Sequence, residues 1–250
     1  MNPRREAILR EMGLVPLWTS RTATGASGAA AAPVEAFEQP GEQGAPSTPS
    51  VAREARIAKM DWPALKAAVP ACTACALHKS RTQTVFGVGD EDADWLLVGE
   101  APGAEEDQQG EPFVGQAGKL LDAMLAAIGL ARGTNVYIAN VLKCRPPSNR
   151  NPEPSEVAQC APHLQRQIGL IKPKLILAMG RFAVQTLLGT EASIASLRGR
   201  LHTCQGVPLI VTYHPAYLLR TLPDKAKAWQ DLVFAVRTFE GLQPAAAAPT

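Results

Sequence analysis

The chain has 250 residues, of which 46% are hydrophobic and only 5% aromatic, and its formal net charge is +2. This length supports one domain of ordinary size with extensions. No apolar run is long enough to span a membrane, and the N-terminus lacks the apolar segment of a signal peptide, so we expect a cytoplasmic protein. The small net charge neither requires nor excludes a nucleic-acid partner.

Composition divides the chain into four regions. Residues 1–18 are expected to form a short helical segment, and residues 19–56, rich in Ala, Gly, Pro and Ser, a disordered linker. Residues 57–241 should form the folded domain, because they contain regular apolar patterns. Residues 242–250 resemble the linker and are expected to be a disordered tail.

Strands and helices alternate along the folded region. Apolar runs predict strands at 94–100, 135–144 and 173–180 and a hairpin at 199–215. Helical spacing predicts helices at 115–130, 162–172, 181–189 and 224–242, with Pro162 in the first turn of the second. This alternation predicts a parallel sheet covered on both faces, with ligands at the carboxyl ends of its strands.

Four of the five cysteines have the spacing of metal ligands. Cys72 and Cys75 form a C-x2-C pair, and Cys144 and Cys160 are a second, wider pair. Four thiolates complete either a zinc site or an iron–sulfur cluster, and the spacing alone leaves both open, as well as the alternative of unpaired buried cysteines. Cys204 is expected to be a small core residue.

A glycine-rich turn, residues 99–103, follows the first buried strand. Such turns often bind phosphate. This turn contains no lysine, however, and acidic residues in and after it would repel an anion. A phosphate ligand is therefore disfavoured, and these residues alone leave open what the turn binds.

Three motifs occur in order along the chain: "GEAPGAEEDQQGEPFVGQAG", "NVLKCRPPSNRNPEPSE" and "TYHPAYLLR". With the cysteine pattern, they resemble the family-4 iron–sulfur uracil-DNA glycosylases over about residues 57–241. The first motif differs from the "GLAPA"-like motif of the family-5 enzymes. No basic, histidine-containing insertion, as in the variant that traps DNA covalently, lies between Leu142 and Glu156.

The resemblance implies a fold and a cofactor. The fold would be a three-layer α/β/α sandwich around a short, mainly parallel four-stranded sheet. The cofactor would be a [4Fe-4S] cluster, structural in the excision chemistry, with Cys72, Cys75, Cys144 and Cys160 as its ligands.

The resemblance also implies the activity. The protein would flip uracil out of DNA and hydrolyse the N-glycosidic bond, leaving an abasic site as the first step of base excision repair. The expected partner is uracil-containing DNA, single- or double-stranded, bound by a monomer. The N-terminal segment could recruit a replication or repair protein.

Three side chains are expected to surround the extruded uracil. Phe113 would stack on the ring, Asn140 would pair with N3–H and O4, and His214 would donate to O2 as the catalytic electrophile. The other histidines have no comparable context: His78, His163 and His202.

The glycine-rich turn would complete the base site. Glu100, Ala101 and Pro102 are expected to line it, with backbone N–H groups gripping the base. Glu100 is also a catalytic candidate, because a carboxylate could orient the attacking water or balance charge on the sugar. Asp107 is a second candidate, although the acidic run around it also suits a solvated helix start.

Two further groups would contact DNA. A wedge entering the minor groove is expected from Leu218, Leu219 and Arg220, although the leucines could instead pack against the last helix. A basic rim for phosphates is expected from Lys143, Arg145 and Arg150.

Two other functions remain open at this point. A non-catalytic iron–sulfur module that binds DNA or a polymerase would need neither Asn140 nor His214. A zinc-stabilised nucleotide hydrolase is suggested only by the glycine-rich turn and the carboxylates.

Overall fold

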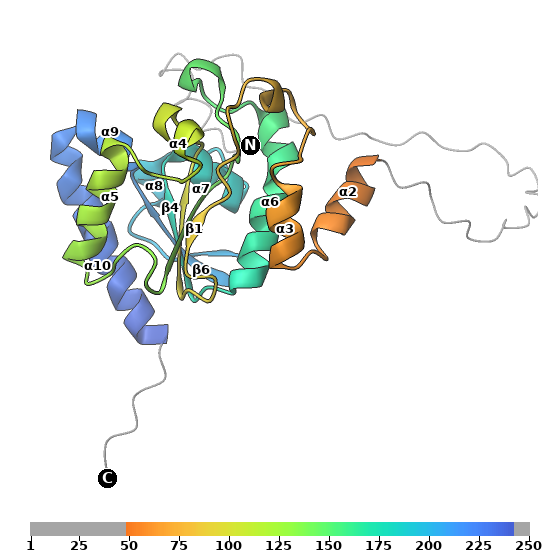
Figure 1. Ribbon diagram of the computed structural model, residues 1–250. Helices are drawn as coiled ribbons and strands as arrows, with labels where there is room; N and C mark the ends of the chain where they lie inside the picture. The colour runs from red at the N-terminus through yellow and green to blue at the C-terminus, as the bar shows by residue number, and fades with distance from the viewer. Residues whose placement is uncertain (1–48, 243–250) are drawn as a thin grey trace, which may run out of the picture. The chain divides into compact units, whose positions relative to one another are not determined.

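A computed structural model of the protein describes residues 49–242 (Figure 1). The expected helical segment at 1–18, the tail at 243–250 and most of the expected linker lie outside the described residues. At the end of that linker, however, the structure has helix α2 (Pro49–Ile57), so ordered structure begins before residue 57. Ile57 is buried, and α2 contacts helix α6. Burial of this apolar side chain helps to offset the entropy lost when the segment becomes ordered, so the end of the expected linker forms a helix.

The core is a six-stranded sheet with the strand order β1-β3-β2-β4-β6-β5. Four neighbouring strands are parallel: β3 (Val136–Asn140), β2 (Trp95–Gly99), β4 (Leu175–Met179) and β6 (Val207–Thr212). The short strands β1 (Val88–Gly89) and β5 (His202–Cys204) add antiparallel edges. The count of four, which the resemblance implied, is therefore wrong for the whole sheet. The predicted hairpin at 199–215 is confirmed by β5 and β6, whereas β1, with two residues, is too short to give a strand pattern.

Helices and 3-10 turns connect the strands. The remaining α-helices are α3 (Trp62–Ala68), α4 (Ala104–Gln109), α5 (Gln116–Ala127), α6 (Pro154–Ile171), α7 (Arg181–Leu188), α8 (Ile194–Leu197), α9 (Pro215–Arg220) and α10 (Lys225–Leu242). The 3-10 turns are η1 (Ala76–Lys79), η2 (Pro147–Asn149) and η3 (Leu222–Asp224).

Alternate residues of the parallel strands face opposite sides of the sheet. In β2, Leu96 and Val98 pack into one apolar cluster with α6 and α7, whereas Trp95 and Leu97 pack into a second cluster with α5 and α10. Because both faces are covered, every residue of β2 is buried. The predicted α/β/α sandwich is confirmed (Figure 1).

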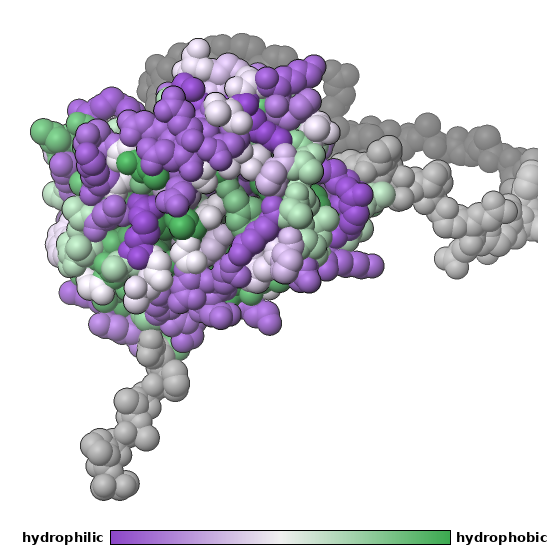
Figure 2. Space-filling model, in the orientation of Figure 1, coloured by the Kyte–Doolittle hydropathy of each residue, from purple (hydrophilic) through white to green (hydrophobic). Residues whose placement is uncertain are grey.

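The surface is mainly hydrophilic over the face seen in Figure 2, and hydrophobic residues reach it only in separate patches. The large apolar side chains are gathered in the two clusters beside the sheet. Among residues 49–242, no helix is both long and apolar enough to cross a bilayer.

Helix α6 begins earlier than its sequence pattern predicts. Pro154 occupies its first turn, and the Glu156 side chain accepts a hydrogen bond from the Glu153 N–H at 2.9 Å. The prediction that Pro162 starts this helix is wrong, since Pro162 lies inside it. The capping residues at 153–156 provide the stronger start signal, and the earlier start places Cys160 on the helix.

Candidate functional site

The carboxyl ends of the four parallel strands meet at one end of the sheet, where a cleft of about 870 Å³ opens. Each strand contributes to its lining. Glu100 follows β2, Asn140 ends β3, Gly180 follows β4, and His214 lies two residues after β6. Parallel sheets of this kind bind ligands at this position.

Phe113 and Asn140 converge on Gly99 at the end of β2. A Cβ atom on Gly99 would lie 2.5 Å from Phe113 Cζ and 2.4 Å from Asn140 Oδ1, so a larger residue would displace both. Asn140 is 2% exposed, and its Oδ1 has no hydrogen-bond partner in the described part of the chain. A buried acceptor of this kind is unfavourable unless a ligand supplies a donor. Asn140 Oδ1 is therefore a candidate ligand acceptor.

His214 lies beside Phe113, with the two ring centroids 5.3 Å apart and the ring planes at 27°. The two rings are stacked on each other, so a base that stacks on Phe113 would also lie close to the imidazole. The Ala216 N–H donates to His214 Nδ1 at 3.1 Å, which leaves the proton of the neutral ring on Nε2. Burial, together with the nearby positive charge of Arg220, lowers the pKa of His214 to about 4. At neutral pH the ring is therefore an uncharged N–H donor.

Glu100 is an acidic group of the cleft with an altered proton affinity. Burial raises the pKa of its carboxyl to about 7, although the positive charge of Arg181 acts in the opposite direction. A carboxyl with this pKa exchanges its proton near neutral pH, as a general base requires.

The glycine-rich turn offers fewer donors than its sequence suggests. Ala101 and Pro102 line the cleft as expected, but Pro102 has no N–H, and the Gly103 N–H donates to Glu106 Oε2 at 3.0 Å. The backbone N–H groups of Glu100 and Ala101 are the remaining candidates.

Phe113 has a left-handed backbone, with φ of 56°, a region that bulky residues rarely adopt. Arg132, in the loop between α5 and β3, donates from Nη2 to the Phe113 carbonyl at 2.8 Å and from Nη1 to the Pro112 carbonyl at 2.9 Å. A Cβ atom on Gly118 of α5 would lie 1.7 Å from the same Phe113 oxygen. Sequence reasoning missed Arg132 because no local pattern links it to a loop 19 residues away.

Two expected site residues lie outside the cleft. Asp107 is 2% exposed, and both of its carboxylate oxygens accept from the Thr82 N–H at 3.0 Å. The acidic run does begin helix α4, as expected, but Asp107 itself is buried and holds the Thr82 loop, outside the cleft lining. Leu218 is 1% exposed and packs in the cluster that contains Leu232 of α10.

Because Leu218 is buried, only two of the three expected wedge residues are left to contact DNA. Leu219 is 41% exposed, and Arg220 lines the cleft. Leu218 faces the core because α9 is a helix, on which neighbouring residues point in different directions.

Lys143 is not part of a basic rim. It is 1% exposed, and its Nζ donates to the Asn140 carbonyl at 2.9 Å and to Gln167 Oε1 at 2.6 Å. The prediction of a phosphate contact is wrong because Lys143 points inward, where it supports the end of β3.

The arginines near the cleft are partly engaged by the protein. Arg145 Nε donates to Asn149 Oδ1 at 2.7 Å, and Arg150 pairs with Glu156 at 2.6 Å. Arg150 still lines the cleft, as does Arg181, which the sequence did not single out.

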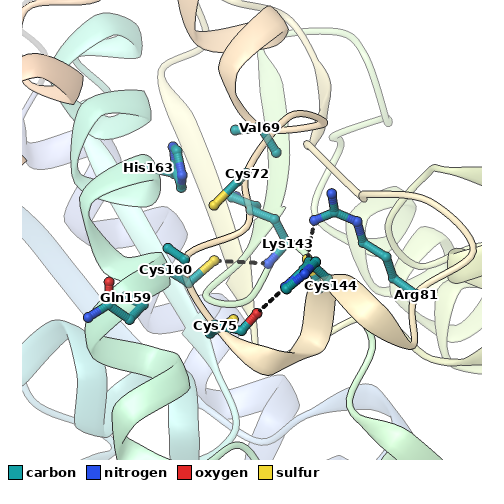
Figure 3. Close-up of a pocket in the computed structure, with 11 residues that line it drawn as sticks. Val69, Cys72, Cys75, Arg81, Lys143, Cys144, Gln159, Cys160 and His163 are labelled. Carbon is teal, nitrogen blue, oxygen red and sulfur yellow. Dashed lines mark hydrogen bonds between the residues drawn. The ribbon is translucent and has the colours of Figure 1, made fainter. Parts of the chain in front are cut away.

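The four cysteines with metal-ligand spacing are free thiols that line one cavity (Figure 3). Cys72 and Cys75 lie between α3 and η1, Cys144 follows β3, and Cys160 lies on α6. Within residues 49–242, no three cysteine, histidine or acidic side chains form a group that could hold one metal ion. The four thiols instead line a shared cavity. Cys204 is buried elsewhere in the core, as expected.

Nitrogen donors approach three of these sulfur atoms. Arg81 Nη1 lies 3.0 Å from Cys144 Sγ, the Lys143 N–H 3.2 Å from Cys160 Sγ, and Arg53 Nη2 3.6 Å from Cys72 Sγ. Such donors stabilise negative charge on sulfur. His163 also lines the cavity, 3.1 Å from Arg53, although the sequence gave it no role.

Three of the four thiols have a raised pKa in this environment. Burial raises the pKa of Cys160 to about 12 and also raises the pKa of Cys75 and of Cys144. Because metal ligands must be thiolates, binding at this cavity would release protons.

Comparison with known proteins gives a consistent result. Residues 86–233 match the uracil DNA glycosylase superfamily. A Type-4 uracil-DNA glycosylase of Archaeoglobus fulgidus is 49% identical over 159 residues, which cover 60% of this chain and 79% of that protein. The Type-4 enzyme of Thermotoga maritima is 47% identical over 161 residues, covering 64% and 83%. The Type-4 enzyme of Pyrobaculum aerophilum is 42% identical over 183 residues, covering 69% and 92%.

Proposed function

Because the chain belongs to the uracil DNA glycosylase superfamily, we propose that it excises uracil from DNA by hydrolysing the bond between base N1 and deoxyribose. The product is an abasic site, which starts base excision repair. The arrangement of three groups in the cleft supports this proposal. An aromatic ring, an unpaired amide oxygen and a neutral imidazole meet in one cleft at the strand ends.

Asn140 reads the base by its hydrogen bonds. Its Oδ1 accepts from uracil N3–H, and its amide N–H donates to O4. Cytosine reverses both groups, so it would leave the buried amide unpaired. Phe113 supports the flipped ring by stacking, and Gly99 leaves the space in which both side chains reach the base.

His214 stabilises the leaving group. When the bond to the sugar breaks, negative charge develops on the base and positive charge on the sugar. The neutral imidazole donates Nε2–H to uracil O2, and this hydrogen bond strengthens as the charge grows. Donors fixed in this way are worth about 3–4 kcal/mol of barrier lowering. The low pKa of His214 keeps the ring neutral throughout the physiological pH range.

Glu100 handles the water. As a carboxylate it orients a water molecule towards the sugar carbon and favours the positive charge that develops there. Its pKa of about 7 means that about half of the molecules carry this charge at neutral pH.

The four cysteines hold a [4Fe-4S] cluster in this proposal. All four line one cavity, and a [4Fe-4S] cluster there would take one thiolate for each iron atom, which matches the four cysteines. The relatives that carry the Type-4 name agree with this choice. When bound, the cluster supplies a structural cross-link between the loop after α3, the end of β3 and helix α6.

We propose that the enzyme acts as a monomer, since residues of one chain line the cleft, and that it acts in the cytoplasm on single- and double-stranded DNA. Leu219 and Arg220 stand at the exposed end of α9, where they can contact DNA beside the extruded base. In this proposal, the segment before residue 49 recruits a repair or replication protein.

Uracil release from a labelled oligonucleotide tests the proposal. The protein should convert uracil sites into alkali-sensitive sites without added metal or nucleotide. Asn140→Ala and His214→Ala should each lower the single-turnover rate by about 100-fold or more. His202→Ala, on edge strand β5 and outside the cleft, is the matched control and should leave the rate unchanged. If both site variants kept full activity, the assignment would fail.

A further inference from the structure

Phe113 needs support, because its backbone conformation is unfavourable for a residue with a large side chain. A φ of 56° brings Cβ close to its own peptide group. Such a conformation persists only where the surrounding structure imposes it. Phe113 is 5% exposed, and its ring lies against Gly99 and His214, so the backbone angle determines where the ring stands in the cleft.

Arg132 is the group that imposes this conformation. Its two terminal nitrogens donate to the consecutive carbonyls of Pro112 and Phe113 at 2.9 and 2.8 Å. Asp122 of α5 fixes the guanidinium in turn, accepting from Nε at 3.1 Å and from Nη2 at 2.9 Å. A planar, charged fork of this kind holds two acceptors in a fixed relative orientation, which a lysine could not do.

The backbone of helix α5 packs against the Phe113 carbonyl at Gly118. Gly118 approaches the Phe113 oxygen so closely that any Cβ would overlap it. The carbonyl therefore lies between a helix backbone and a guanidinium, and it cannot rotate while both remain in place.

We propose that Arg132 is a positioning residue for uracil excision, which holds Phe113 in its left-handed conformation and thereby keeps the stacking ring beside Asn140 and His214. This inference rests on the proposed function of the cleft. Arg132 itself lies outside the cleft lining, so it acts only through the Phe113 loop.

Arg132→Met tests this directly, since it keeps an apolar side chain as far as the position of Nε and removes the three donor nitrogens. The single-turnover excision rate should fall by about tenfold, the effect expected when hydrogen bonds from a charged donor are lost. Arg132→Lys should recover part of this loss, because one ammonium can reach only one carbonyl well. Asp122→Asn should give a smaller loss in the same direction.

A double-mutant cycle separates positioning from general stability. If Arg132 acts through the ring, Arg132→Met should change the rate less than about twofold in a Phe113→Ala background. Equal losses in both backgrounds would overturn the proposal, and so would a Phe113→Ala protein with normal activity.

The matched control is Lys174→Met. Lys174 is 52% exposed and pairs with Asp94 at 3.0 Å, at the end of the sheet opposite the cleft. Lys174→Met should leave the excision rate unchanged and should lower the unfolding temperature less than Arg132→Met does, because an exposed ion pair contributes little to stability.

A structural measurement tests the clamp apart from activity. In a crystal structure of the Arg132→Met protein, φ of residue 113 should become negative. A retained positive φ would overturn the clamp. Absence of uracil release by the unaltered protein would instead reject the proposed function, while this angle would still test the clamp.

Discussion

Replacing Gly99 by alanine should strongly reduce the rate of uracil excision while the fold persists. The added methyl would lie 2.4 Å from Asn140 Oδ1 and 2.5 Å from Phe113 Cζ, and real Cβ contacts are longer than 3.0 Å. Neither neighbour can retreat easily, because Asn140 is 2% and Phe113 5% exposed. The methyl must therefore push at least one of them out of position.

The expected size of the effect follows from what is displaced. Overpacking a core site lowers the free energy of unfolding by about 1–3 kcal/mol, and each kcal/mol lowers Tm by about 2–4 °C in a protein of this size. The base would lose stacking worth about 1–3 kcal/mol and a hydrogen bond worth about 1 kcal/mol. Together these losses raise the barrier by about 2–4 kcal/mol, so the rate should fall about 30- to 1,000-fold.

The assay is single-turnover excision from a uracil-containing oligonucleotide, with Tm from circular dichroism. Gly169→Ala is the control, because Gly169 lies on α6 with only Arg166 Nη1 near its Cβ position, at 4.0 Å. This change should raise stability by up to about 1 kcal/mol and leave the rate unaltered. If Gly99→Ala retained the parent rate, Phe113 and Asn140 would not be meeting the base at this point.

The pKa of Glu100 predicts that kcat/KM rises by up to about tenfold between pH 6 and 8, because the carboxyl is mostly protonated below pH 7 and ionised above it. Glu100→Gln should lower the rate and remove this pH dependence, and a flat profile for the unaltered protein would refute the role. Cys144→Ser should reduce bound iron and visible absorbance, whereas Cys204→Ser, which changes a cysteine outside the cavity, should retain both. Lys143→Met should lower the free energy of unfolding by about 1–3 kcal/mol in chemical denaturation, since it leaves buried acceptors unpaired; no change would mean that Lys143 is exposed after all.

The layout of the sheet and the strand-end position of the cleft could be predicted from the sequence. Strands β2 and β4 are short runs of buried residues, and they read as continuous apolar segments because helices cover both faces. Phe113, Asn140 and His214 are marked by motifs that adjoin the strand ends. The resemblance, rather than periodicity, suggested their roles.

Other features depend on contacts that no local pattern reveals. The sequence predicts Lys143 as a surface cation beside Cys144, but in the structure it is in the core, where it donates to Gln167, 24 residues away. The sequence also suggests a solvated helix position for Asp107, but the Thr82 N–H donates to its buried carboxylate. In both cases the charged group turns inward because a distant segment supplies the matching hydrogen-bond partner.

Helix α2 has a practical consequence for any shortened form of the protein. Its Arg53 Nη2 lies 3.6 Å from Cys72 Sγ and 3.1 Å from His163 Nε2, so α2 contacts two residues that line the cysteine cavity. A truncation at residue 57, the expected start of the folded domain, would remove both contacts. A shortened form should therefore lack only residues 1–48 and retain α2. The role of the removed segment can then be tested while the Arg53 contacts remain.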